Sequence, residues 1–153
     1  MIQPVLLSNI DDSIEIKNPC DVVCARYRAR ELAEAMGFSK KAQWEISIAV
    51  SEAATNILKF AEKGIIVIRS VNDGCGYIEF EAIDKGPGFE NVEKALMDGV
   101  SRGKQINKNM IWNYRLGIGS GLPAINRLMD NLFIASTSGK GAHLIAKKML
   151  ENP

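Results

Sequence analysis

Residues 117–123 read Gly-Ile-Gly-Ser-Gly-Leu-Pro and run directly into an apolar segment, 124–129, that we expect to be helical. Three glycines at alternate positions leave the backbone bare and free to adopt positive φ. A helix N-terminus adds unpaired N–H groups and a partial positive charge, and both suit a phosphate. Taken alone, the segment is consistent with a nucleotide phosphate site and also with a flexible hinge before a helix.

The spacing of these glycines excludes two familiar phosphate-binding loops. A Rossmann fingerprint requires a glycine three residues after its second glycine, and here that position is Leu122. A Walker loop ends in Gly-Lys followed by Ser or Thr, whereas this loop continues with Leu122 and Pro123. A phosphate site at this loop would therefore belong to another class, which the rest of the chain must identify.

Length and composition limit the class of protein. A chain of 153 residues predicts a single domain, 1–153, with a sizeable core. The net charge of +1 provides no bulk field for nucleic acid or an anionic membrane, and no apolar run approaches the roughly 18 residues of a spanning helix. Residues 1–4 lack the basic region of a signal peptide. We therefore expect a cytoplasmic protein that binds neither nucleic acid nor membrane.

The cysteines do not indicate a zinc site or a disulfide framework. Cys20, Cys24 and Cys75 form no Cys-x-x-Cys pair, and a single histidine is present as a co-ligand. Reduced thiols are the expected state. The histidine, His143, lies near the start of a predicted strand, where a structural role is a better interpretation than metal binding or catalysis.

Periodicity and turn residues predict a strand, two helices, a hairpin, a loop, a helix and a second hairpin. Asp21 is the candidate N-cap of the first long helix, and Ser39 caps the second. The expected strands are 13–17, 65–71, 77–84, 132–137 and 142–149, and the expected helices are 22–36, 39–61, 91–97 and 124–129. This order predicts a two-layer α/β sandwich, in which helices cover one face of a mixed β-sheet.

A carboxylate and a carboxamide share one face of the second predicted helix. Glu52 and Asn56 are four residues apart, so they lie one turn apart among apolar neighbours. Burial of a charge there without a partner is costly. Their oxygens suit Mg²⁺, and a glutamate beside the metal can act as a general base. A local hydrogen bond on a solvated face is the alternative interpretation.

Asp84 ends a predicted strand just before the Gly-Pro-Gly of 86–88. A carboxylate at that position can accept a hydrogen bond from the exocyclic amine of adenine, while Gly86 and Gly88 allow the backbone to approach a flat ring. Ordinary turn chemistry is the alternative, because Asp and Gly cluster at strand ends. Similarly, the Gly-x-Gly of 139–141 predicts only a hairpin turn when it is taken alone.

In order, four motifs resemble the asparagine box and the three glycine boxes of the GHKL-type (Bergerat) ATP-binding fold shared by gyrase, histidine kinases and MutL. The motifs are Glu-x-x-x-Asn-x-x-Lys-Phe at 52–60, Asp-x-Gly-x-Gly at 84–88, Gly-x-Gly-x-Gly at 117–121 and Gly-x-Gly at 139–141. Within that superfamily the chain resembles the small bacterial anti-sigma-factor serine/threonine kinases of the RsbT switch type. The residues that carry this second resemblance are those of 48–56, 119–123 and 127–130.

The resemblance implies a role for each site residue. Glu52 would be the base that takes the proton from the substrate hydroxyl, Asn56 would ligate Mg²⁺, and Asp84 would bind the adenine of ATP. The other nucleotide-binding positions that it implies are Gly86, Gly88, Arg115, Gly117, Gly119, Ser120, Gly121, Leu122 and Gly141. Residues 98–116 would be the ATP lid. The chain departs from the family pattern in a longer lid and in Ala142, where threonine is usual.

The function that the resemblance implies is phosphorylation of a STAS-domain antagonist protein in a bacterial partner-switching pathway. A PP2C-type phosphatase and a sigma factor are further partners that it suggests, and a homodimer stays open. One alternative is a nucleotide-gated binding module with little transfer activity. Another is a histidine-kinase-like catalytic module, which would need an accepting histidine from a partner because His143 lies in a predicted strand.

Overall fold

The computed structural model describes residues 9–72, 74–87, 100–101, 104–105, 121–137 and 140–151. Its elements, in chain order, are β1 (Asn9–Ile16), α1 (Pro19–Met36), α2 (Lys40–Ala61), β2 (Gly64–Val71), β3 (Tyr77–Asp84), β4 (Val100–Ser101), β5 (Lys104–Gln105), α5 (Gly121–Leu128), β6 (Asn131–Thr137) and β7 (Gly141–Met149). The two long helices and the two expected hairpins are confirmed within a few residues. The helix expected at 91–97 lies outside the described residues.

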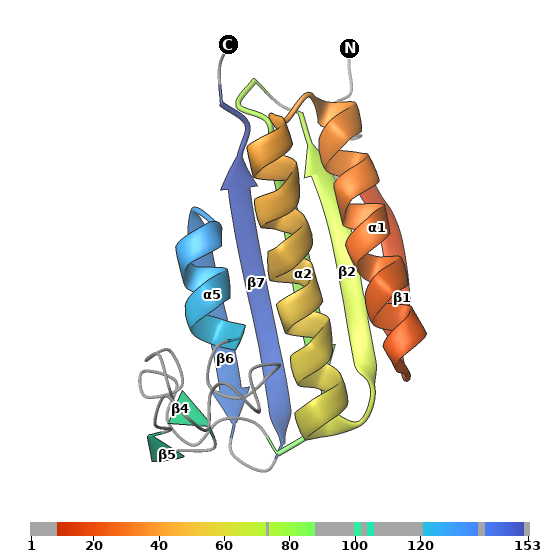
Figure 1. The fold of residues 1–153 in the computed structure, drawn as a ribbon, viewed down its shortest axis with the longest axis vertical. Coiled ribbons are helices and arrows are strands. Elements are labelled where there is room, and N and C mark those ends of the chain that lie inside the picture. Colours follow the sequence, from red (N-terminus) through yellow and green to blue (C-terminus); the bar gives the residue numbers. More distant parts are fainter. Residues whose placement is uncertain are drawn as a thin grey trace, which may run out of the picture.

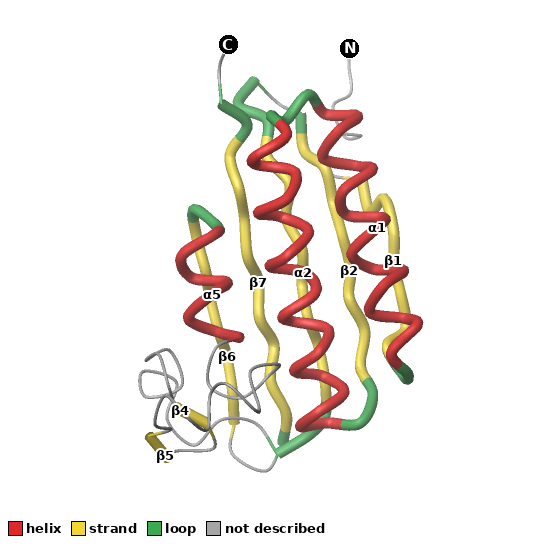
Figure 2. The backbone as a smooth tube through the Cα atoms, in the orientation of Figure 1, coloured by secondary structure: helices red, strands yellow, loops and turns green. Residues whose placement is uncertain are grey.

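The long strands form one sheet in the order β1-β2-β3-β7-β6, and each neighbouring pair in it is antiparallel. Helices α1, α2 and α5 lie side by side over one face of this sheet (Figure 1). The two-layer α/β sandwich is therefore confirmed, but the sheet is antiparallel rather than mixed. The reason is visible in Figure 2: α1 and α2 run in opposite directions, so the chain returns to the end where β1 stopped before β2 begins.

The first long helix begins earlier than its apolar periodicity predicts, because its cap lies further upstream. Asn18 is the N-cap, and its side chain accepts a hydrogen bond of 3.0 Å from the N–H of Cys20. Asp21, which was expected to be the cap, instead lies in the first turn and accepts from the N–H of Asn18 at 3.1 Å. This reciprocal pair is a capping box. Pro19 fits the first helical position because no N–H is needed there.

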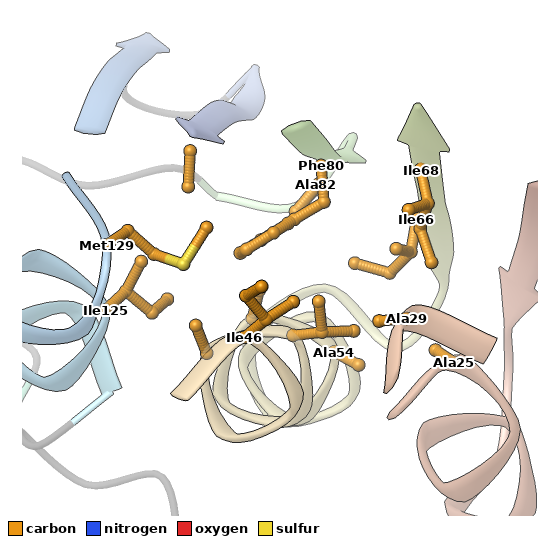
Figure 3. Packing of buried hydrophobic residues seen from close by; sticks show 14 of the residues in the cluster. Ala25, Ala29, Ile46, Ala54, Ile66, Ile68, Phe80, Ala82, Ile125 and Met129 are labelled. Atoms are coloured by element: carbon orange, nitrogen blue, oxygen red, sulfur yellow. The ribbon is translucent and has the colours of Figure 1, made fainter. Parts of the chain in front are cut away.

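The core fills the space between the helices and the sheet, with α2 at its centre (Figure 3). The buried residues of α1 are alanines, which allow that helix to lie close to its neighbours. The largest fully buried apolar side chains are Phe80, Ile16, Ile46, Ile57, Ile66, Ile68, Ile78, Ile125 and Val50. No helix among the described residues is both long and apolar enough to cross a bilayer.

The other face of the sheet carries a polar network. Arg69 donates to Glu79 at 3.0 Å and also pairs with Glu81, and Glu81 contacts His143 Nε2 at 2.5 Å. Burial alone would raise the pKa of Glu81, but its contacts with His143 and Arg69 leave that pKa below its usual value. These residues alternate along their strands with buried ones such as Phe80, so they face away from the helices. The contact of His143 with Glu81 is of the kind that the expected structural role requires.

One end of each of four elements lies on the same side of the sandwich. The C-terminus of α2, the end of β3, the N-terminus of α5 and the start of β7 all lie toward the lower edge of the molecule in Figure 1. Helix α2 leads directly into β2 at this edge through Glu62, which has the positive φ of 70° that is uncommon for a residue with a side chain. The sequence motifs that carry candidate site residues therefore converge at one edge.

Replacing Phe80 with alanine is expected to lower the free energy of unfolding by about 3–5 kcal/mol, because the ring is buried and its removal leaves a cavity. Phe133→Ala is the matched control, since Phe133 is 64% exposed and should cost no more than about 0.5 kcal/mol. Urea denaturation measures both. Equal losses for the two variants would contradict the position of the core.

Candidate functional site

Glu52 and Asn56 lie one turn apart on α2, both half-buried, as the sequence predicted. Burial raises the pKa of the Glu52 carboxyl above its ordinary value. No hydrogen bond or ion pair joins the Glu52 side chain to another of the described residues. A local bond between Glu52 and Asn56 therefore does not explain the pair. A carboxylate with a raised pKa and no described partner has the properties of a proton acceptor.

The carboxamide of Asn56 lies directly against the first residue of α5. A Cβ atom built on Gly121 would lie only 2.7 Å from Asn56 Nδ2 and 3.0 Å from Asn56 Oδ1. Any side chain at position 121 would therefore displace Asn56. The absence of a side chain lets the N-terminus of α5, with its unpaired N–H groups, lie beside α2.

Asp84 is the last residue of β3 and is paired with Gly64 of β2 and Ala142 of β7. Its Oδ1 accepts a hydrogen bond of 2.9 Å from the N–H of Gly86. Turn chemistry is thus part of the role of Asp84, as the alternative interpretation held. The strand pairing also fixes this carboxylate on the helix-covered side of the sheet, because it alternates with outward-facing Ile83.

Three glycines make close backbone contacts around Asp84. A Cβ atom on Gly64 would lie 2.5 Å from the carbonyl oxygen of Ile83, and one on Gly141 would lie 2.3 Å from the carbonyl oxygen of Asp84. Gly141 also has a φ of 116°, which a residue with a side chain rarely adopts. On Gly86 the added atom would lie 2.6 Å from the Ala61 Cβ. Close packing of these glycines therefore fixes the backbone at the end of β3, where the Asp84 carboxylate lies.

The candidate site residues follow one another along the axis of α2. Gly86, next to Asp84, packs on the last turn of the helix at Ala61. Asn56 lies about one turn before that point, and Glu52 one further turn before Asn56. A ligand that contacts both Asp84 and Asn56 would therefore lie along the C-terminal half of α2, with Glu52 just beyond its end.

Sequence reasoning missed the residues that fix the far end of α5. Lys148, which is 9% exposed, donates to the carbonyl oxygen of Leu128 at 2.6 Å and lies 3.4 Å from Glu45 of α2. A cation at the C-terminus of a helix is electrostatically favourable. The detectable signal was a lysine at a core-facing position of β7, where the alternation calls for an apolar residue. Gly64 was also missed, because a glycine that follows a helix is readily explained as the end of that helix, and its contact with Ile83 depends on the sheet.

Several predicted site residues lie outside the described residues. They are Gly88, Arg115, Gly117, Gly119 and Ser120. Of the predicted lid, 98–116, the structure describes only the short antiparallel pair β4–β5. Leu122 is described and is 4% exposed, so its side chain belongs to the core and only its backbone can face a ligand.

Comparison with known proteins agrees with the motifs. A family model described as the histidine kinase-like ATPase domain matches residues 17–148. The chain is 35% identical to the serine/threonine-protein kinase RsbT of Bacillus subtilis (strain 168) over 143 residues, which cover 93% of this chain and 98% of that protein. It is also 31% identical over 111 residues to the anti-sigma F factor of Clostridium acetobutylicum, with 68% of each chain covered. The anti-sigma F factor of Caldanaerobacter subterraneus subsp. tengcongensis is 37% identical over 101 residues, or 63% of each chain.

These similarities confirm the family that the four motifs predicted. They extend over nearly all of the described fold, from before α1 to the end of β7. A domain of this type binds ATP, and the described ends of α2, β3, α5 and β7 are where the motifs meet. The chain therefore belongs to the histidine kinase-like ATPase family, in the group that includes the kinase RsbT and, more distantly, the anti-sigma F factors.

Proposed function

We propose that the chain is an ATP-dependent serine/threonine protein kinase whose substrate is a STAS-domain antagonist protein in a bacterial partner-switching pathway. The observation that carries this proposal is the contact between Asn56 and Gly121, which places a helix N-terminus about one turn from Glu52. A proton acceptor then lies beside an anion-binding helix end. Similarity over 93% of the chain to a protein named as a serine/threonine-protein kinase supports the same activity.

The reaction assigns Glu52 the role of general base. The substrate hydroxyl oxygen would form a bond to the γ-phosphorus of ATP, the bond to the bridging oxygen would break, and ADP would leave. Glu52 would accept the hydroxyl proton, which only its ionised form can do. Its raised pKa moves its proton affinity toward neutral pH, where a general base is most effective. A base of this kind contributes roughly 10²–10⁴-fold, and positioning and charge stabilisation supply the remainder.

Asn56 is the described residue that best fits a Mg²⁺ ion. Its carboxamide offers an oxygen of the type that Mg²⁺ prefers, at the helix end where phosphate groups would bind. When bound, the metal would neutralise negative charge on the phosphate oxygens. The Asn56 carboxamide lies against Gly121, so its oxygen would be next to the N-terminus of α5.

Asp84 would select the base of the nucleotide. Its carboxylate lies among the close-packed glycines at the end of β3, with Oδ1 already accepting from the N–H of Gly86. A carboxylate accepts hydrogen bonds and donates none when ionised. It would therefore accept from the exocyclic amine of adenine and disfavour guanine, which presents a carbonyl oxygen at the same position.

Gly121→Ala is expected to weaken ATP binding at least tenfold, because the added methyl group would displace Asn56 from the N-terminus of α5. Asn126→Ala is the control, since Asn126 is exposed on the same helix. Isothermal calorimetry with ATP and Mg²⁺ measures both. If Gly121→Ala binds ATP with wild-type affinity, the contact between Asn56 and Gly121 is not needed for ATP binding.

The variant Asp84→Asn distinguishes the role of Asp84 in its turn from its proposed role in binding adenine. Asparagine can still accept the N–H of Gly86, so the free energy of unfolding is expected to change by less than about 1 kcal/mol. ATP affinity is nevertheless expected to fall at least tenfold, because an acceptor-only carboxylate is lost. If calorimetry finds that Asp84→Asn binds ATP as wild type does, Asp84 has only the role of a turn residue.

Glu52→Gln tests both the kinase function and the sign of the pKa shift. Purified STAS-domain proteins are incubated with the chain and labelled ATP, and label on a serine or threonine is measured against pH. The wild-type rate is expected to rise as pH increases through the raised pKa of Glu52, whereas Glu52→Gln should be slower by roughly 10²–10⁴-fold and show no such rise. Labelling of a histidine would instead favour the histidine-kinase-like alternative.

The same variant has an expected effect on stability. Because burial raises the Glu52 pKa in the folded state, the stability linked to its neutral form is present below the ordinary pKa of glutamate. That stability is lost as pH rises through the folded-state pKa. Glu52→Gln should therefore be at least as stable as wild type at pH 7–8, by urea denaturation. A catalytically dead variant that is also less stable would indicate misfolding and not loss of a base.

A further inference from the structure

Four exposed apolar side chains form a ridge on the outer surface of the helical layer. Val23 and Tyr27 are one turn apart on α1, and Trp44 and Ile48 are one turn apart on α2. Their exposed fractions are 53%, 62%, 49% and 43% respectively. The two helices lie side by side in Figure 1, and α1 and α2 are antiparallel neighbours. We call these four residues the α1–α2 ridge.

A cation–π contact joins the two halves of the ridge. The guanidinium carbon of Arg30, on α1, lies 4.1 Å from the ring centroid of Trp44, on α2. This contact shows that the Trp44 ring turns toward α1. Trp, Tyr and Arg are the residues that most often dominate binding energy at interfaces, and a cation–π contact favours this position of the ring.

The α2 half of the ridge lies on the N-terminal side of Glu52. Ile48 precedes Glu52 by one turn, about 6 Å, and Trp44 precedes it by two turns, about 12 Å, on the same outer surface of α2. Asn56, Gly86 and Asp84 all lie on the opposite side of Glu52, toward the C-terminus of α2. If the nucleotide occupies that C-terminal side, a protein that presents a hydroxyl to Glu52 must cover the N-terminal side.

The surroundings of the ridge carry positive charge. Arg26 is one turn before Arg30 on α1, and Lys40 and Lys41 lie within one turn of Trp44; Arg26, Lys40 and Lys41 are exposed. The nearest carboxylate of α2, Glu45, is already engaged with Lys148 at 3.4 Å. On α1, the exposed carboxylates Glu31 and Glu34 lie one turn after Tyr27 and Arg30, so cations outnumber free carboxylates in the rim. An apolar centre with a predominantly basic rim is complementary to an apolar patch with an acidic rim.

We propose that the α1–α2 ridge is the docking surface for the protein substrate. The partner is a folded STAS-domain protein that carries an apolar patch with an acidic rim about 6–12 Å from its phosphorylated serine or threonine. This inference rests on the proposed kinase function and extends it. The ridge determines which protein is phosphorylated, whereas the ends of α2, β3 and α5 determine which nucleotide is used.

Trp44→Ser and Ile48→Ser test the ridge in the full chain, with Phe133→Ser as the matched control. Phe133 is 64% exposed on β6, on the sheet face opposite the helices. The STAS-domain proteins of the labelling experiment serve as substrates. Each ridge variant is expected to raise the KM for the protein substrate at least tenfold, with kcat at saturating substrate within about twofold of wild type. ATP affinity by calorimetry should be unchanged, and the control should match wild type in all three quantities.

Lys41→Glu adds a variant that acts through charge alone. It is expected to raise the KM for the protein substrate in 50 mM salt and to lose most of that effect at high salt, because rim charges are screened. Urea denaturation should show wild-type unfolding for all of these surface variants, so a lost fold cannot produce the expected pattern.

The outcomes distinguish the ridge from the kinase function. If the substrate is labelled with wild-type KM by Trp44→Ser and Ile48→Ser, the docking proposal is overturned and the kinase function stands. If no STAS-domain protein is labelled by the wild-type chain that binds ATP, both proposals fail. If the wild-type chain alone sediments as a dimer and the ridge variants as monomers, the ridge is an interface between two copies, and the docking proposal is again overturned.

Discussion

The arrangement of the site depends on one close contact, that between the carboxamide of Asn56 and the bare backbone of Gly121. Helix α5 has little freedom to lie elsewhere, because Leu122 and Ile125 are buried in the core and Lys148 binds the carbonyl of Leu128 at the other end. With both its apolar face and its C-terminus fixed, α5 can direct its N-terminus only along α2. A side chain at position 121 would break this relation at the point where an anion would bind.

The direction of α2 determines the order in which the other parts of the site follow one another. Its sheet-facing side is continuous core, whereas its outer side changes in character along the chain. Near the C-terminus Ala61 packs against Gly86, just after the end of β3. Toward the N-terminus the exposed or half-buried positions are taken by Asn56 and Glu52, and then by Ile48 and Trp44. In the proposed function, one rigid helix would therefore set the distances between a nucleotide, a base and a protein partner. Such precision is difficult to obtain from separate loops.

The sequence could predict the long described elements, the helix-on-sheet layers and the family, because strand alternation, helix periodicity and glycine motifs are local signals; the roles of the site residues stay predictions. Contacts between segments that are far apart in the sequence were harder to predict. Asp21 was assigned as a cap because the reciprocal bond to Asn18 depends on the actual turn geometry. The sheet was expected to be mixed because the direction of β2 depends on how α1 and α2 pack. Gly64 and Lys148 gained their roles only from β3 and α5, which lie elsewhere in the sequence.

Lys148 and Glu52 are two ionisable side chains that the fold removes wholly or partly from solvent, and a comparison of them shows how Glu52 differs. Lys148, at 9% exposure, is compensated by the carbonyl of Leu128 and by Glu45, as a buried charge must be in a stable fold. Glu52 has no such partner among the described residues, and burial accordingly raises its pKa. A fold selected for stability alone would pair this carboxylate or replace it with an apolar residue, which α2 accepts at many neighbouring positions. The absence of a compensating partner for Glu52 among the described residues therefore supports the proposal that this carboxylate accepts a proton during function.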